Sequence, residues 1–200
     1  MSGLLVVITG GIGSGKSFVM KYLESLRYYT IYTDKIAHEV ISSKEFLTAA
    51  SNHLKRNITI KDIKSEIENN NQFLDFIEDF VHPAVQRIRD EMIESALKDN
   101  NVVFVEIPLF FEKKLRDSLL KYGKVFVVST ICGIEEQILR AKTRNVNLSD
   151  KMLNLIIARQ TSDDVRVAGS DFIIYTYGEN KVIKDINKLN KEVQKLLRSL

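Results

Sequence analysis

The sequence predicts an α/β protein in which one parallel sheet of five strands lies between two layers of helices. Short runs rich in β-branched residues recur along the chain, and helical patterns separate them. Because these runs are almost continuously apolar, each strand is expected to be covered on both faces, as in a parallel sheet. The five predicted strands are Leu4–Ile8, Thr30–Thr33, Val102–Glu106, Val125–Ser129 and Phe172–Thr176.

Size and charge restrict the class of protein. The chain has 200 residues, of which 44% are hydrophobic and 28% charged, as in an ordinary globular domain. Its net charge of +3 is dispersed, which argues against a nucleic-acid tail or a basic membrane anchor and suits phosphate-bearing ligands. The apolar start, Met1–Ile8, is too short to span a bilayer, and the lone Cys132 cannot form an internal disulfide. We expect a cytoplasmic protein with no nucleic-acid or membrane partner; a monomer is expected and an oligomer stays open.

The connection between the second and third predicted strands is too long for a simple crossover, at roughly seventy residues. Its helical patterns run over 35–56, 60–69 and 71–98. They predict an inserted helical subdomain over about 36–98. Within it Pro83 cannot continue a helix, so we expect a break at 82–83, with Pro83 opening the next helix.

Directly after the first strand, Gly10–Ser17 matches the phosphate-loop (P-loop) pattern G-x-x-x-x-G-K-[ST]. Its glycines let the backbone turn around a phosphate and point N–H groups at it, and the following helix adds its positive end. Lys16 supplies a charge for the β- and γ-phosphates, and the Ser17 hydroxyl is placed to ligate Mg²⁺. The motif predicts nucleotide binding and not its use, since GTPases, transporters and motors share it. The residues expected to bind ATP here are Gly11, Ile12, Gly13, Ser14, Gly15, Lys16, Ser17 and Phe18.

Two acidic residues lie at the ends of predicted strands. Asp34 follows the second strand, and the carboxyl ends of parallel strands line the ligand crevice into which strand one delivers the P-loop. There Asp34 could orient and deprotonate an acceptor hydroxyl, or it could cap the helix that begins at Lys35. Glu106 is the last residue of the third strand. It could hold the metal through water, or it could contact Lys16 or Ser17 and position them without touching the ligand. Position alone leaves both alternatives open.

Four arginines form a further candidate group in the second half of the chain. Arg140 and Arg144 lie four residues apart in a helical pattern and therefore share one face of the helix; Arg159 and Arg166 follow. Guanidinium groups can clamp a transferring phosphoryl group and stabilise its charge. A solvated basic helix is the other explanation for such a pair.

Together these segments resemble the dephospho-CoA kinase family. The P-loop is generic, whereas T-D-x-I-A, an isolated H-P after a helical insertion, and P-L-F-F-E after strand three are specific to that family. The resemblance covers nearly the whole chain in the expected order. The matching segments are Ile8–Ser17, Thr33–Ala37, His82–Pro83, Glu106–Glu112, Arg140 with Arg144, Arg159–Gln160, Arg166, and Ser170–Asp171 ahead of Gly178.

The resemblance implies a three-layer α/β/α P-loop kinase fold in one domain over 1–200, with a helical acceptor-binding insertion and a mobile helical lid over about 139–168. It implies that ATP, with Mg²⁺, phosphorylates the ribose 3′-hydroxyl of dephospho-CoA to give ADP and coenzyme A, the last step of coenzyme A synthesis. The implied catalytic residues are Asp34 as general base, Lys16 and Arg140. Arg140, Arg144 and Thr176 would complete the ATP site, and Ser17 and Glu106 would serve the metal. The implied substrate-binding residues are Thr9, Asp34, His82, Pro108, Leu109 and Arg166.

Three positions depart from the family pattern. Tyr32 replaces the first acid of the usual D-A-D, so Asp34 is the only acid left there. Thr176 replaces the usual Asn near the adenine pocket, so adenine recognition must rest on backbone groups or be looser. Phe18 stands where Thr is common, a change of little consequence because only its backbone amide is needed.

Two rival functions stay open at this stage. A kinase of the same fold for a nucleoside monophosphate or a sugar acid is one, and the H-P and P-L-F-F-E segments argue against it. A nucleotide-binding regulatory domain without activity is the other, and intact Lys16, Ser17, Asp34 and Arg140 argue against that. No N-K-x-D segment for guanine is present, which argues against a GTPase.

Replacing the P-loop lysine tests the nucleotide-binding prediction. We expect Lys16→Ala to weaken ATP binding and turnover together, because the variant loses the charge that the β- and γ-phosphates require. Calorimetric titration with ATP and a turnover assay measure the two effects separately. Normal ATP affinity in this variant would contradict the assignment of Gly10–Ser17 as a P-loop.

Overall fold

A computed structural model describes residues 3–146 and 148–200; position 147 of the predicted lid region lies outside the described residues. Strands and helices alternate along the chain, as the sequence pattern predicts. The elements are β1 (Leu4–Gly10), α1 (Lys16–Ser25), β2 (Tyr29–Tyr32), α2 (Thr33–Ser42), α3 (Lys44–Leu54), α4 (Ile60–Asn69), α5 (Asn71–Asp99), β3 (Val102–Glu106), α6 (Arg116–Leu119), a 3₁₀ turn (Leu120–Tyr122), β4 (Lys124–Ile131), α7 (Ile134–Arg144), α8 (Asp150–Ala158), α9 (Asp163–Gly169), β5 (Phe172–Tyr175) and α10 (Glu179–Arg198).

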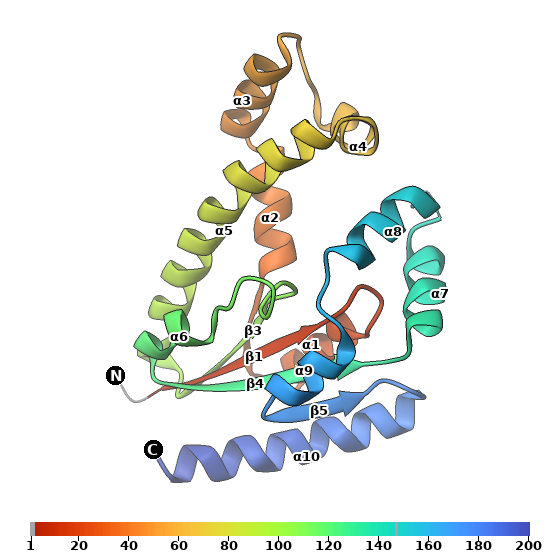
Figure 1. The fold of residues 1–200 in the computed structure, drawn as a ribbon. Helices are drawn as coiled ribbons and strands as arrows, with labels where there is room; N and C mark the ends of the chain where they lie inside the picture. Colours follow the sequence, from red (N-terminus) through yellow and green to blue (C-terminus); the bar gives the residue numbers. More distant parts are fainter. Residues whose placement is uncertain (1–2, 147) are drawn as a thin grey trace. The chain divides into compact units, whose positions relative to one another are not determined.

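The five strands form one sheet in the order β2-β3-β1-β4-β5, with helices on both sides (Figure 1). The central strand β1 pairs in parallel with β3 and β4, and β4 pairs in parallel with β5. Every residue of β1 and of β3 is buried, which explains why these strands are apolar without alternation. The predicted fold class, a five-stranded parallel sheet with helices on both sides, is confirmed.

The C-terminal helix α10 packs on β5 and on α1. The apolar spacing over Val182–Leu200 predicts this helix, and its buried positions Val182, Ile186, Leu189 and Val193 recur every three or four residues. Within residues 3–146 and 148–200, no helix is both long enough and apolar enough to cross a membrane.

The chain divides into two compact units, and each has its own packing. The first contains the sheet and is formed by the chain up to Ile31 and from Ile93 onward; the second is Tyr32–Met92. In the second unit the ring of Phe46, fully buried, lies 5.4 Å from that of Phe80 in an edge-on arrangement. Phe76 stacks on His53 at 4.3 Å and on Phe73 at 5.9 Å. These ring contacts stabilise the second unit, because aromatic pairs contribute beyond the area they bury.

The expected break at 82–83 is wrong, because α5 runs without interruption from Asn71 to Asp99 and contains Pro83. A proline inside a helix leaves the carbonyl four residues earlier without its N–H partner. Here that carbonyl belongs to Asp79, and both Pro83 and Asp79 are exposed, so water can replace the missing donor. Val81 before the proline and Arg89 after it are both buried, so the helix is packed on either side of Pro83.

The single helical pattern over 35–56 is two helices in the structure, α2 and α3. Ser43 separates them with an extended backbone, and its hydroxyl accepts the Phe46 N–H at 3.1 Å as an N-cap. Serine side chains favour this position because they satisfy an amide that the first turn cannot pair. Apolar periodicity continued across the break, so periodicity alone did not reveal it.

Candidate active site

The P-loop joins the buried end of β1 to the first turn of α1. Gly10, Gly13 and Gly15 have φ angles of 148°, 70° and 92°, a region that side chains with a Cβ rarely adopt. Gly15 is the N-cap of α1, and Lys16 and Ser17 are the first two residues of the helix. The loop therefore presents its amides together with the positive end of a helix, the arrangement that binds anions.

The loop backbone lies in close contact with the segment that follows β4. A Cβ atom added at Gly13 would lie 2.3 Å from the backbone oxygen of Gln137, and one added at Gly10 would lie 2.4 Å from the Thr130 hydroxyl. Cys132 is buried beside the same loop, with its sulfur 3.7 Å from the Gly13 carbonyl, and burial raises the pKa of its thiol. Glycine is required at Gly13 for two independent reasons, backbone conformation and lack of space.

Lys16 holds its positive charge at the loop itself. Its ammonium donates to the carbonyls of Gly10, at 3.0 Å, and Gly11, at 2.9 Å, and the residue is only 8% exposed. A partly desolvated ammonium interacts more strongly with phosphate oxygens than one in water. This placement agrees with the role expected for the P-loop lysine.

Thr176, at the end of β5, connects the P-loop to Arg140. Its hydroxyl donates to the Ser14 carbonyl at 2.8 Å and accepts from Arg140 Nη1 at 3.1 Å, while its own carbonyl accepts from Arg140 Nη2 at 2.6 Å. Arg140 Nε donates to Glu136 at 2.6 Å. Every nitrogen of the Arg140 guanidinium is thus committed to groups beside the loop, so this arginine is fixed near the predicted nucleotide site.

Arg144 differs from Arg140 although both lie on α7. It is exposed, whereas the Arg140 side chain is 32% exposed and held by Thr176 and Glu136. Arg159, at the end of α8, is exposed as well. Phe18 is also exposed, and its backbone N–H donates to the Gly15 carbonyl at 3.1 Å within the first turn of α1.

The predicted substrate residues that follow β1 and β3 lie next to one another. The Thr9 hydroxyl donates to the Pro108 carbonyl at 3.3 Å, and the Ile107 N–H donates to the Ile8 carbonyl at 3.0 Å. Pro108 and Leu109 are half-buried, so their exposed parts can contact a ligand. The segment after β3 is therefore tied to the strand that carries the P-loop.

A divalent metal would find oxygen donors at Ser17 and Glu106. Ser17 is half-buried at the start of α1, and Glu106 is 2% exposed at the carboxyl end of β3, where it is the register partner of Ile8. In the described part of the chain, no cluster of three or more His, Cys, Asp or Glu side chains could hold a metal by itself. One hydroxyl and one carboxylate fit Mg²⁺, which usually keeps several waters and binds phosphate oxygens as its other ligands.

Arg166, expected to bind substrate, is 2% exposed and pairs with half-buried acidic side chains in a cluster of charges. Its Nη2 donates to Glu112 at 3.0 Å, and its Nη1 donates to Asp163 at 3.3 Å and to the Thr161 carbonyl. Burial raises the pKa of Asp163, an effect that the Arg166 charge opposes. A buried arginine needs such partners, because an unpaired buried charge is strongly destabilising.

Two glutamines at the P-loop had no assigned role from the sequence. Gln137 is 5% exposed and donates to the Cys132 carbonyl at 2.8 Å, while Gln160 accepts the Ile12 N–H at 2.9 Å. Gln160 belongs to the Arg159–Gln160 segment of the resemblance, and that resemblance is the only feature of the sequence that singles it out. No feature of the sequence singles out Gln137, because a single glutamine in a helical pattern is indistinguishable from a solvent-exposed residue.

In the second unit, Asp34 is exposed in the first turn of α2. The alternative role as N-cap is wrong, since α2 begins at Thr33 and its N-cap is Tyr32. A carboxylate in the first turn is still favoured by the helix dipole. His82 is half-buried on α5.

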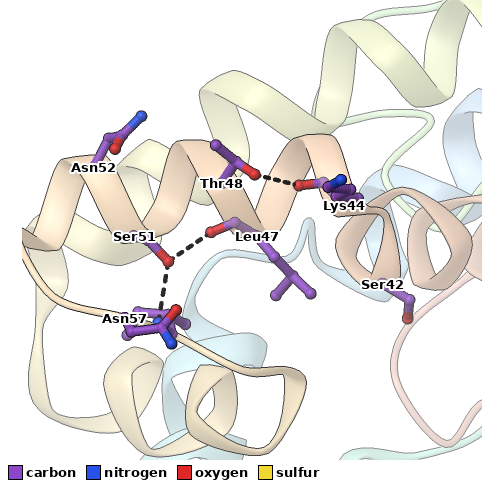
Figure 2. A pocket seen from close by; sticks show the side chains of 8 residues that line it. Ser42, Lys44, Leu47, Thr48, Ser51, Asn52 and Asn57 are labelled. Carbon is purple, nitrogen blue, oxygen red and sulfur yellow. Dashed lines mark hydrogen bonds between the residues drawn. The ribbon is translucent and has the colours of Figure 1, made fainter.

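The second unit also contains a pocket of about 410 Å³ beside α3 (Figure 2). Two hydroxyl groups that line the pocket donate to backbone carbonyls of α3. Thr48 donates to the Lys44 carbonyl and Ser51 to the Leu47 carbonyl, both at 2.8 Å. The Ile58 N–H donates to Ser51 at 3.0 Å and ties the next segment to α3. The lining is mostly polar and consists of Ser42, Lys44, Leu47, Thr48, Ser51, Asn52, Asn57 and Ile58.

A parallel sheet whose central strand leads through a glycine loop and lysine into a helix defines a P-loop kinase-type nucleotide-binding protein. Comparison with known proteins narrows this class, because a family model described as dephospho-CoA kinase matches residues 4–181. The chain belongs to the dephospho-CoA kinase family.

Individual relatives agree with this family. A Helicobacter pylori protein named dephospho-CoA kinase is 32% identical, covering 98% of this chain and 96% of the relative. The solved structure of dephospho-CoA kinase from Campylobacter jejuni is similar with a TM-score of 0.65 and 26% identity, over 96% of this chain and 97% of that one. A Thermus thermophilus crystal structure shares the fold with a TM-score of 0.75 at 24% identity, over 98% and 99% of the two chains.

Adding one methyl group to the P-loop tests whether close packing shapes it. In Gly13→Ala the Cβ would meet the Gln137 carbonyl and the residue would keep a positive φ, so the loop must shift and its amides must turn. We expect ATP affinity to fall by at least about tenfold, the scale of such local strain. Gly178→Ala is the control, since Gly178 has a φ of 73° and nothing within 4 Å of its added Cβ. Equal ATP affinity in both variants and the unmodified protein would show that close packing at Gly13 does not shape the P-loop for ATP.

Proposed function

We propose that this chain transfers the γ-phosphoryl group of ATP to the ribose 3′-hydroxyl of dephospho-CoA. The products are ADP and coenzyme A. The proposal rests on one observation above all, the complete P-loop with the Lys16 ammonium held at its edge in a chain of the dephospho-CoA kinase family. The names of the relatives supply the acceptor, and the loop supplies the donor site.

In this proposal the P-loop binds the ATP phosphates. The loop amides and the start of α1 face the β-phosphate, and Lys16 neutralises charge on the β- and γ-phosphates. Because phosphoryl transfer involves little covalent chemistry by the protein, positioning and charge stabilisation provide most of the rate. Mg²⁺, when bound with ATP, would neutralise phosphate charge beside Ser17 and Glu106.

Asp34 is proposed to orient the acceptor hydroxyl and to accept its proton. The hydroxyl oxygen forms the new bond to the γ-phosphorus while the bond to the β,γ-bridging oxygen breaks, and ADP carries away that electron pair. Three features support the choice of Asp34: it is exposed, it lies in the first turn of the helix that follows β2, and it is the only acid in its segment because Tyr32 replaces the other. A carboxylate within hydrogen-bond reach of a hydroxyl serves this purpose in kinases.

The two arginines of α7 are proposed to act differently on the nucleotide. Arg140 is fixed by Thr176 and Glu136 and would bind ATP from that position. Arg144 is exposed on the same helix and would meet the phosphates if the region 139–168 acts as a lid. Closing such a lid excludes water, which limits wasteful hydrolysis of ATP.

The second unit is proposed to bind the acceptor. It carries Asp34 in its first helix and His82 on α5, and its polar pocket beside α3 offers hydroxyl and amide groups. In the first unit, Thr9 at the end of β1 and Pro108 and Leu109 after β3 are proposed as further acceptor-binding residues.

The reaction is tested by ADP release from Mg·ATP with and without dephospho-CoA, and with AMP, gluconate and shikimate as alternative acceptors. We expect strong stimulation by dephospho-CoA alone, with coenzyme A as the product. Stimulation by another acceptor would replace the proposed substrate. Tight ATP binding without stimulation by any acceptor would favour a regulatory nucleotide-binding role.

Asp34→Asn tests the proposed base. We expect turnover to fall by about 10²-fold or more, the usual scale of acid–base catalysis, while ATP affinity stays nearly unchanged. Steady-state kinetics and ATP titration measure the two quantities. Nearly unchanged turnover would remove Asp34 from this role.

A further inference from the structure

Gln160 links the end of α8 to the P-loop. Its side-chain oxygen accepts the Ile12 N–H at 2.9 Å, across 148 positions of sequence. Its own backbone N–H donates to the Ile157 carbonyl at 3.0 Å, so the residue is part of the ordered end of the helix. One amide of the loop is therefore oriented by a side chain from a distant segment.

The residue after Gln160, Thr161, is held by the charge cluster around the buried Arg166. Glu112 Oε1 accepts the Thr161 N–H at 2.6 Å and Arg166 Nη2 at 3.0 Å, and Arg166 Nη1 donates back to the Thr161 carbonyl. Both backbone groups of Thr161 are thus bonded to ionic side chains, the half-buried Glu112 and the buried Arg166. Hydrogen bonds to charged groups are shorter and stronger than neutral ones, so this anchor is rigid.

A second connection runs from the same cluster to the loop through Gln137. Gln137 Nε2 donates to Asp163 Oδ2 at 3.2 Å, and Asp163 in turn pairs with Arg166 at 3.3 Å. A Cβ added at Gly11 would lie 2.5 Å from Gln137 Oε1, and Gly13 abuts the Gln137 backbone. The cluster therefore supports the loop from two sides.

We propose that Gln160 is a positioning residue for ATP, and that the Glu112–Arg166–Asp163 cluster holds Gln160 and Gln137 against the P-loop. Arg166 then acts through Thr161 and Gln160 rather than by contact with the acceptor, which explains why it is 2% exposed. A glycine-rich loop loses much conformational freedom when it binds phosphate, and a loop that is already oriented loses less. This inference rests on the proposed use of the loop for ATP, but not on the identity of the acceptor.

The first test compares Gln160→Met with Gln194→Met. Methionine keeps the length of glutamine but lacks the oxygen that accepts the Ile12 N–H. Gln194, on α10, is exposed and also makes one side-chain hydrogen bond, to Tyr28 at 2.9 Å, so its variant loses a comparable contact away from the loop. The readouts are ATP affinity by calorimetry without acceptor, KM for each substrate, kcat and Tm.

We expect Gln160→Met to weaken ATP binding by about five- to tenfold, the scale of one net hydrogen bond, with KM for ATP rising in parallel. KM for dephospho-CoA and Tm should match those of Gln194→Met, because Gln160 supports the loop and not the folded core. Unchanged or tighter ATP binding in Gln160→Met overturns the proposal, since the Gln160 contact would then be either irrelevant to the loop or in competition with phosphate.

The second test uses Glu112→Gln, which keeps an oxygen for the Thr161 N–H but removes the charge that pairs with Arg166. We expect a lower Tm together with weaker ATP binding, and an unchanged KM for the acceptor. A raised acceptor KM with normal ATP affinity would overturn the proposal and return Arg166 to the acceptor site. Because ATP titration needs no acceptor, failure of the dephospho-CoA assay would leave these results interpretable.

Discussion

The close approach of the P-loop backbone to the segment after β4 is the constraint on which the site depends. A phosphate is bound by N–H groups that point inward, and the chain can present several of them only where it turns through conformations that favour glycine. Gly10 and Gly13 also lie too near Thr130 and Gln137 to carry a side chain. The loop geometry is therefore set jointly by its own glycines and by the surface on which they pack.

Buried charge is used in two different ways around this loop. The Lys16 ammonium donates hydrogen bonds to the Gly10 and Gly11 carbonyls, which place it at the loop. Arg166 is paired with Glu112 and Asp163, so its charge is neutralised within the protein. The first arrangement places an ammonium group at the loop, where phosphate is expected to bind, whereas the second connects distant segments through an ion-paired anchor.

Arg140 and Thr176 show how a departure from the family pattern is accommodated. The Thr176 hydroxyl bridges the Ser14 carbonyl and the Arg140 guanidinium, so the residue is 4% exposed and joins the P-loop to α7. A longer amide in its place would have to make these bonds differently. Thr176 therefore connects the loop to α7, a role separate from the adenine contact that the resemblance predicts at this position.

The sequence by itself determined the parallel sheet, the P-loop and the family, because apolar strands, helix periodicity and a glycine-lysine motif are local patterns. The tertiary structure decided the features that depend on exposure to solvent and on contacts between segments distant in sequence. The α5 helix continues through Pro83, where Pro83 and Asp79 are exposed and water can replace the missing donor, and no local pattern records that exposure. Gln137 and Gln160 reach the loop, and Arg166 becomes buried, only when segments far apart in sequence pack together. Local chemistry identifies the residues that bind phosphate, whereas packing selects the residues that hold them in place.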